Sequence, residues 1–173
     1  DGLGELILQQ EQVPERVIEH PVTDLLYQDL LQHGFSKEHA AGFVGMAFQF
    51  RRAYHFTTVK LKGSGSAMQR LRMHLWRSIF TDDIDLYETH MWNRMQEFST
   101  LLLGPTGTGK GVAASIIGLS SYIPYNPAKA EFIRNFASGF VELNLSQFPA
   151  TLIESELFGH RKGSFTGAVS DYD

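Results

Sequence analysis

The residues best suited to chemistry lie in a glycine-rich segment, residues 104–112, which reads Gly-Pro-Thr-Gly-Thr-Gly-Lys-Gly-Val. Its first seven residues match the G-x-x-x-x-G-K pattern of a phosphate-binding loop. Glycines let such a loop wrap closely, so that backbone N–H groups and the positive end of the next helix face one anion. Lys110 would then reach the β- and γ-phosphates of a nucleotide. The predicted contact residues are Gly104, Pro105, Thr106, Gly107, Thr108, Gly109, Lys110, Gly111 and Val112. The alternative is a glycine-rich turn with a chance lysine.

The residue after the lysine departs from the general pattern. Most such loops have Ser or Thr there, whose hydroxyl binds Mg²⁺, whereas this chain has Gly111. The metal would have to be held by water, phosphates and an acidic residue elsewhere. The only comparable acidic string ends in Asp82 and Asp83, before the loop, and we interpret it as a helix end followed by a solvated turn. We therefore identify no metal-ligating carboxylate pair.

A second candidate site is a glycine-bounded tip near the end of the sequence. Its residues are Gly163, Ser164, Phe165, Thr166, Gly167 and Ala168. Glycines on both sides permit a loop that exposes the aromatic ring, and burial of an exposed Phe by a partner is worth about 2 kcal/mol. This pattern favours protein docking. The alternative is a surface turn whose Phe165 packs locally.

A strand, a helix and a second strand are expected to position these sites. Residues 99–103 form an apolar run before the glycine-rich loop, and residues 112–117 have helical character after it. Residues 140–144 are expected to form the next strand, and this order is typical of a βαβ unit in a parallel sheet. Residues 122–128 contain two prolines and are predicted to be a loop, whereas residues 150–158 are predicted to form a short helix.

The first half of the sequence is predicted to be mainly helical. Apolar residues follow helical spacing after Val22 and again after Ser36, which is a suitable N-cap. The β-branched run at 57–61 predicts a short strand, and residues 63–66 predict a turn that begins another helix. We expect residues 1–58 to be a helical N-terminal segment, for which we consider a regulatory role, and residues 59–173 to hold both candidate sites. The new helix is expected to bury Met68, Leu71, Leu75 and Ile79, with Arg70, Arg72 and Arg77 on a solvated face rather than in a nucleic-acid patch.

Composition excludes several classes of protein. The chain of 173 residues is 43% hydrophobic with a net charge of −4, which is typical of a globular domain. Its longest apolar run, residues 40–48, is far shorter than the roughly 20 residues that span a bilayer. Without cysteine, neither disulfides nor cysteine-ligated metal sites can form, so an intracellular, cytoplasmic location without a membrane partner is expected. His74, His90 and His160 are isolated, and no metal site is predicted from them. The sequence begins at Asp1 without a methionine, and we expect it to be a segment of a longer protein.

Together these motifs resemble the AAA+ ATPase domain of the sigma-54-dependent transcriptional activators, also called bacterial enhancer-binding proteins. The signature loop of that family is GAFTGA, and residues 163–168 differ from it only by Ser164. Residues 154–160 look like the helix that leads to that loop. The family's phosphate loop also lacks Ser or Thr after its lysine, although Gly111 replaces the usual glutamate. Gly63 with residues 67–69 resembles the start of the domain, so the similarity runs in order from about Leu61 to Ala168.

The resemblance implies an α/β fold, the N-terminal part of an AAA+ P-loop NTPase with a parallel sheet and flanking helices. Members of the family form homo-oligomeric rings, hydrolyse ATP with Mg²⁺ between subunits, and remodel the closed complex of sigma-54 RNA polymerase. Carried over by position, Gly104, Gly107, Gly109 and Lys110 would hold the phosphates. Phe165 and Thr166 would touch sigma-54, and Asn144 would be the asparagine that pairs with the catalytic glutamate and signals nucleotide state.

Other parts of the family's machinery lie after the signature loop. These are the acidic Mg²⁺ and water-activating motif, the sensors, the arginine finger, the helical lid and the DNA-binding domain. We therefore expect this chain alone to be inactive as an ATPase and to meet DNA only through a domain outside it. Two alternatives remain. One is a non-hydrolysing nucleotide-binding or interaction module, and the other is a small-molecule P-loop kinase, which would need a substrate site and a lid. Residues 81–97 are assigned no role.

Overall fold

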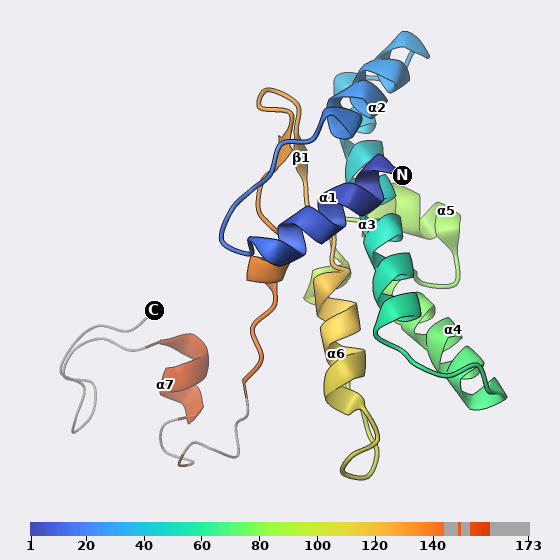
Figure 1. Ribbon diagram of the computed structural model, residues 1–173, viewed down its shortest axis with the longest axis vertical. Coiled ribbons are helices and arrows are strands. Elements are labelled where there is room, and N and C mark those ends of the chain that lie inside the picture. Colours follow the sequence, from blue (N-terminus) through green and yellow to red (C-terminus); the bar gives the residue numbers. More distant parts are fainter. Residues whose placement is uncertain (144–148, 150–152, 160–173) are drawn as a thin grey trace. The chain divides into compact units, whose positions relative to one another are not determined.

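Helices dominate the computed structural model, which describes residues 1–143, 149 and 153–159 (Figure 1). The α-helices are α1 (Gly2–Gln12), α2 (Pro21–Gln32), α3 (Lys37–Val59), α4 (Ser66–Phe80), α5 (Ile84–Leu86), α6 (Lys110–Leu119) and α7 (Ile153–Phe158). Shorter turns are the π-helical η1 (Tyr87–Met91) and the 3-10 turns η2 (Met95–Glu97) and η3 (Ala137–Gly139). Asp1–Phe140 form one compact unit, and the chain from Val141 onward forms another. None of the described helices has the length and apolar character needed to cross a lipid bilayer.

The predicted helix starts in the first half are confirmed. Pro21 occupies the first turn of α2, where its missing N–H costs no hydrogen bond. The Ser36 hydroxyl accepts a hydrogen bond from the backbone N–H of His39 at 3.2 Å and so caps α3. α4 begins directly after Gly65 and buries Leu75 and Ile79, as its apolar spacing predicts.

The parallel sheet predicted from the sequence is absent from the described residues, and that part of the predicted fold class is wrong for them. Residues 99–103 and 140–143 are not strands. Leu101 is 81% exposed and Leu103 is 84% exposed. A strand persists only where neighbouring strands satisfy its N–H and C=O groups, and none of the described residues pairs with these two segments. Asn144, at the end of the second predicted strand, lies outside the described residues.

A short strand forms inside the predicted loop at 122–128, and a second strand follows just after it. β1 (Tyr125–Asn126) pairs antiparallel with β2 (Glu131–Phe132), Tyr125 opposite Phe132. Both of those side chains are buried and contact each other edge to face, with ring centroids 5.6 Å apart. Pro124 and Pro127 therefore flank a hairpin strand instead of marking an irregular loop. Proline has no backbone N–H, and it is tolerated at positions that flank a strand.

The strand predicted at residues 57–61 is also wrong, because α3 continues to Val59. The hydroxyls of Thr57 and Thr58 donate to carbonyls one turn earlier, at Ala53 (2.6 Å) and Tyr54 (2.8 Å), which accommodates both β-branched residues in the helix. Arg72 lies on α4 but is not part of a solvated face. Its guanidinium donates to the carbonyls of Thr57, Leu61 and Gly63 and so holds the turn between α3 and α4.

The core is organised around α3. Phe48 stacks on Phe132 with ring centroids 4.2 Å apart, and both are fully buried. On another side of α3, the buried Tyr87 hydroxyl donates to Gln49 Oε1 at 2.5 Å. Burial raises the pKa of Tyr87 to about 12, and the nearby positive charge of Arg52 acts more weakly in the opposite direction. Tyr87 therefore keeps its proton at neutral pH and donates it to Gln49, which holds the start of η1 against α3.

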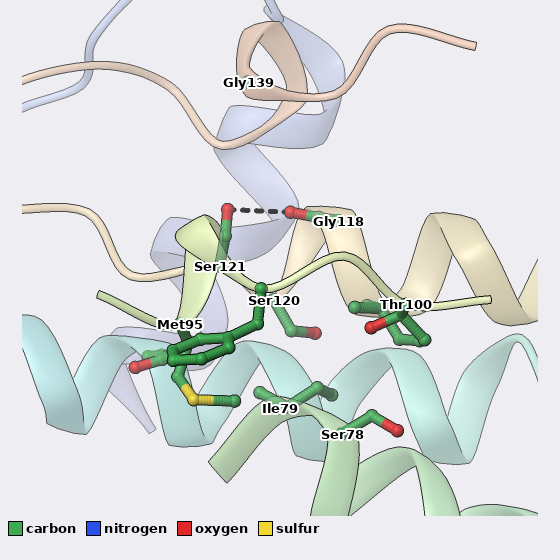
Figure 2. Close-up of a pocket in the computed structure, with 11 residues that line it drawn as sticks. Ser78, Ile79, Met95, Thr100, Gly118, Ser120, Ser121 and Gly139 are labelled. Atoms are coloured by element: carbon green, nitrogen blue, oxygen red, sulfur yellow. Dashed lines mark hydrogen bonds between the residues drawn. The ribbon is translucent and has the colours of Figure 1, made fainter. Parts of the chain in front are cut away.

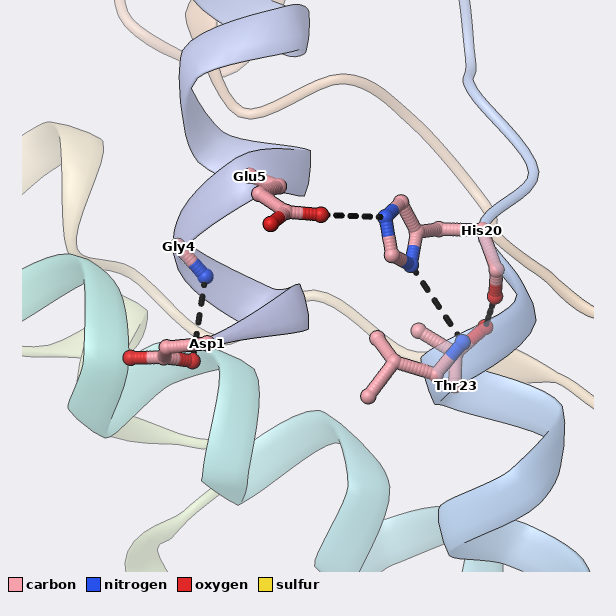
Figure 3. A network of polar contacts seen from close by, with 6 residues as sticks. Asp1, Gly4, Glu5, His20 and Thr23 are labelled. Atoms are coloured by element: carbon pink, nitrogen blue, oxygen red, sulfur yellow. Dashed lines mark hydrogen bonds and ion pairs between the residues drawn. The ribbon is translucent and has the colours of Figure 1, made fainter.

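Polar contacts join α1 and α2 to this core. Asp1 caps α1 by accepting from the N–H of Gly4, and Glu5 approaches His20 at 3.8 Å just before α2 (Figure 3). At the other end of α1, the buried Asn135 amide donates to the carbonyls of residues 10, 13 and 16 at 2.9–3.1 Å. α1 to α3 thus belong to the same compact unit as α4 and α6. The boundary proposed at residue 58 stays a prediction.

One buried guanidinium connects α3 to α6. Arg52 is fully buried, and its two terminal nitrogens donate at 2.7 Å to the carbonyls of Leu119 and Ser121. The cation also lies 4.6 Å from the centre of the Phe48 ring. Burial lowers the pKa of Arg52, and the charge of Arg134 lowers it further. The guanidinium remains charged at neutral pH, so it forms strong charge-assisted bonds to the carbonyl of Leu119, the last residue of α6, and to that of Ser121 just after the helix.

Arg52→Met should therefore destabilise the protein by about 2–5 kcal/mol, because two partly buried carbonyls lose their donors and no side chain replaces them. Arg51→Met is the matched control. Arg51 pairs with the exposed Asp1, so its loss should cost less than about 1 kcal/mol. Urea unfolding followed by circular dichroism measures both changes. Equal losses for the two variants would contradict this role of Arg52.

Candidate phosphate-binding site

The glycine-rich loop leads directly into α6. Gly107 and Gly109 have φ values of +82° and +86°, in the left-handed region that glycine adopts without strain. Gly109 is the N-cap residue of α6 and has no capping side chain. Lys110, Gly111 and Val112 form the first turn, so their N–H groups have no acceptor within the helix. The loop therefore offers donors and the positive end of a helix dipole at one place.

The lysine lies across its own loop. Lys110 Nζ donates to the carbonyls of Gly104 and Pro105, each at 2.8 Å. The hydroxyl of Thr108 donates to the same Pro105 carbonyl at 2.8 Å. These bonds draw the ends of the loop together and hold the ammonium beside it. A phosphate oxygen can replace the carbonyls as acceptor, because a charged acceptor forms the stronger bond with an ammonium.

A pocket of about 320 Å³ adjoins the lysine. Its apolar wall comes from Leu71 on α4 and Ala113 on α6, together with Leu102 and Leu103 before the loop. The remaining lining residues are Gly104, Pro105, Thr108, Gly109 and Lys110. No carboxylate belongs to this lining in the part of the chain that the structure describes. The pocket can therefore hold an anion by the loop and its lysine, but these residues offer no group to activate water.

A second cavity, which the sequence did not predict, lies at the opposite end of α6 (Figure 2). Its volume is about 230 Å³, and its lining includes Gln49, Ser78, Thr100 and Ser120. The Ser120 hydroxyl is buried and has no hydrogen-bond partner among the described residues, whereas Ser121 donates to the carbonyl of Gly118 at 2.8 Å. Lining residues come from segments distant in sequence, so no local motif marks this cavity. Its α6 residues come from the C-terminal end of that helix, whereas the glycine-rich loop precedes the N-terminal end.

Other predicted site residues fall outside the described part of the chain. Asn144 and the tip Gly163, Ser164, Phe165, Thr166, Gly167 and Ala168 belong to this group. Of the helix predicted at 150–158, α7 is described from Ile153 to Phe158 and ends before Gly159, whose φ is +72°. In the described residues, no group of three or more His, Asp or Glu side chains is arranged to hold a metal ion.

Comparisons with known proteins agree with the order of the motifs. The sequence model of the family described as Sigma-54 interaction domain matches residues 84–173. The Nif-specific regulatory protein of Azotobacter vinelandii is 45% identical over 78 residues, which are 45% of this chain and 12% of that protein. The acetoin dehydrogenase operon transcriptional activator AcoR of Bacillus subtilis is 33% identical over 81% of this chain and 20% of its own length.

A third relative is the C4-dicarboxylate transport transcriptional regulatory protein DctD of Rhizobium meliloti. It is 36% identical over 63% of this chain and 18% of its own length. No solved structure matches the chain. The chain thus spans only 12% to 20% of the full length of these three relatives.

Two glycines of α6 should respond in opposite ways to alanine. Gly111 is exposed in the first turn, so Gly111→Ala should stabilise the protein by about 0.5–1 kcal/mol through lower entropy of the unfolded chain. At Gly118, an added Cβ would overlap the ring of Phe140. Gly118→Ala should therefore destabilise the protein by about 1–3 kcal/mol. Thermal unfolding of both variants tests the prediction, and stabilisation by both would show that Phe140 does not pack against α6.

Proposed function

This chain belongs to the family of sigma-54 interaction domains, and on that basis we propose that residues 104–112 bind the phosphates of ATP together with Mg²⁺. In this proposal the chain is part of a transcriptional activator that works as an ATP-driven ring in the cytoplasm. ATP hydrolysis in the ring would remodel the closed complex of sigma-54 RNA polymerase into the open one.

The position of Lys110 carries the proposal. Its ammonium lies beside the loop while its backbone N–H belongs to the uncapped first turn of α6. One residue therefore contributes both charge and a donor at the helix N-terminus, the two features that favour a phosphate. Gly107 and Gly109 in their left-handed conformations let the loop close around the anion.

Mg²⁺ would be held by phosphate oxygens, water and an acidic residue that this sequence does not identify, because Gly111 has no hydroxyl. The ion would neutralise charge that develops on the phosphates during transfer. By the family resemblance, Asn144 would pair with the catalytic glutamate and report the nucleotide state. Its carboxamide suits that role because it both donates and accepts hydrogen bonds.

The tip at 163–168 would make the contact with sigma-54. Phe165 supplies an apolar ring and Thr166 a small polar group between two glycines. The chemistry fits a loop that inserts into a protein partner, since burial of the ring drives association and glycines allow the loop to change shape. Contact with DNA would need a further domain.

A non-hydrolysing nucleotide-binding module is the second candidate function. It is favoured by the lining of the loop pocket, which has no carboxylate in the described part of the chain. Binding of ATP without turnover at any protein concentration, in a full-length protein that carries this sequence, would support this alternative over the motor.

The lysine can be tested directly on the 173-residue chain. Lys110→Ala should weaken ATP binding by roughly 10- to 100-fold, because a charge-assisted bond to phosphate is worth about 1.5–3 kcal/mol. Isothermal titration calorimetry with ATP and Mg²⁺ measures the change. Lys62→Ala removes an exposed lysine before α4 and is the control. If both variants bind ATP like the unmodified chain, the loop is not the phosphate site.

The tip can be tested in a full-length protein that carries this sequence. Thr166→Ala should leave ATP turnover largely intact and abolish formation of the open promoter complex, because the change removes a partner contact and leaves the phosphate loop untouched. ATPase assays and permanganate footprinting of the promoter report the two activities separately. Retained open-complex formation would rule out the proposed contact.

A further inference from the structure

A cavity of about 500 Å³ lies between the first half of α3 and the π-helical turn η1. Its lining consists of Glu38, His39, Gly42, Phe43 and Met46 from α3, and of Glu88, Thr89 and Trp92 from η1 and its C-terminal end. None of these residues belongs to either of the sites described above. The volume is within the range of small-molecule pockets, about 300–1,000 Å³.

The two walls follow from the geometry of their helices. Glu38, Gly42 and Met46 are separated by four residues, so they share one face of α3. In η1 the N–H of Trp92 donates to the carbonyl of Tyr87 at 2.9 Å, which gives the wider turn of a π-helix. Tyr87 is buried in the core, while Glu88 and Thr89 remain exposed and line the cavity. The π-helical turn thus anchors one side in the core and presents the other to the cavity.

Two carboxylates make the wall of the cavity negatively charged. Glu38 and Glu88 are exposed carboxylates from different elements, and neither has an ion-pair or hydrogen-bond partner among the described residues. No lysine or arginine belongs to the described lining, and His39 is its one basic side chain there. The field inside the cavity therefore favours a cation and disfavours phosphate or carboxylate ligands.

Aromatic rings complete the wall, and neighbouring rings fix their positions. Trp92 meets Tyr122 edge to face with centroids 4.6 Å apart, and Phe43 meets Phe35 in the same way at 5.2 Å. At Gly42 an added Cβ would lie 3.6 Å from the Trp92 ring, so this part of α3 lies close to the indole. The thioether of Met46 adds a polarizable surface.

We propose that this cavity binds a small organic ammonium ion. A cation of this class contacts the faces of Trp92 and Phe43 through cation–π attraction while Glu38 and Glu88 balance its charge. Its alkyl groups occupy the apolar surface, which a hydrated metal ion cannot use. A neutral apolar molecule of the same shape gains the same contacts with the rings but leaves both carboxylates without a counter-charge.

The experiment compares choline with 3,3-dimethylbutan-1-ol, in which carbon replaces the charged nitrogen. The indole N–H signal of Trp92 in ¹H–¹⁵N spectra of the ¹⁵N-labelled 173-residue protein is the reporter. The chain has two tryptophans, so the Trp76→Phe variant shows which signal belongs to Trp92. Choline chloride should shift the Trp92 indole signal until the shift saturates. Sodium chloride at the same ionic strength is the control and should not produce that shift. The alcohol should bind at least about tenfold more weakly, because it loses the cation–π contact and the attraction to the two carboxylates.

Paired carboxylate variants separate the site from net charge. Glu38→Gln with Glu88→Gln should weaken choline binding about tenfold. Glu15→Gln with Glu19→Gln changes the charge equally, at exposed positions before α2, and should leave binding unchanged. Equal binding of the alcohol and choline, an equal loss in the control pair, or no saturable shift up to about 100 mM choline would each overturn the proposal. None of these outcomes depends on ATP binding, so the proposed phosphate site is tested separately.

Discussion

The buried contact between Arg52 and the end of α6 is the interaction on which the rest of the described fold depends. A helix end leaves carbonyls without donors, and a buried end is stable only if another group supplies them. Here one guanidinium on α3 serves the carbonyls of Leu119 and Ser121 while lying against Phe48. The helix that begins with the phosphate loop is thereby fixed at its far end to the central helix of the core. Without that donor, α6 would have only its apolar face to hold it.

This arrangement makes the N-terminal helices part of the platform for the loop. Asn135 binds three carbonyls at the end of α1, and the segment that contains Asn135 also supplies Phe132 and Phe136 to the core around α3. α3 in turn contacts α6 through Arg52. Direct hydrogen bonds thus join α3 to the C-terminal end of α6. The phosphate loop lies at the other end of the same rigid element.

Local features of this fold were predictable, and non-local ones were not. Ser36 predicts the start of α3, Gly65 the start of α4, and the glycines before Lys110 the loop. Each of these features depends only on a few neighbouring residues. Thr57 and Thr58 misled the prediction, because their hydroxyls bond to carbonyls one turn earlier and both residues stay in α3. The roles of Arg52 and Asn135 have no sequence signal at all. Their partners are 67 to 125 residues away, and only the folded chain brings them together.

The same distinction explains why a phosphate loop can form beside a segment that is not a strand. The loop needs glycines in left-handed conformations and a helix that follows directly, and both conditions are met between Gly107 and Lys110. A parallel strand instead needs partners that arrive through crossover connections, so its formation is a property of distant sequence. Leu101 and Leu103 remain largely exposed in the described structure, and covering each would contribute about 1.5–3 kcal/mol. The loop geometry is therefore encoded locally, whereas a parallel sheet depends on contacts between segments that are distant in sequence.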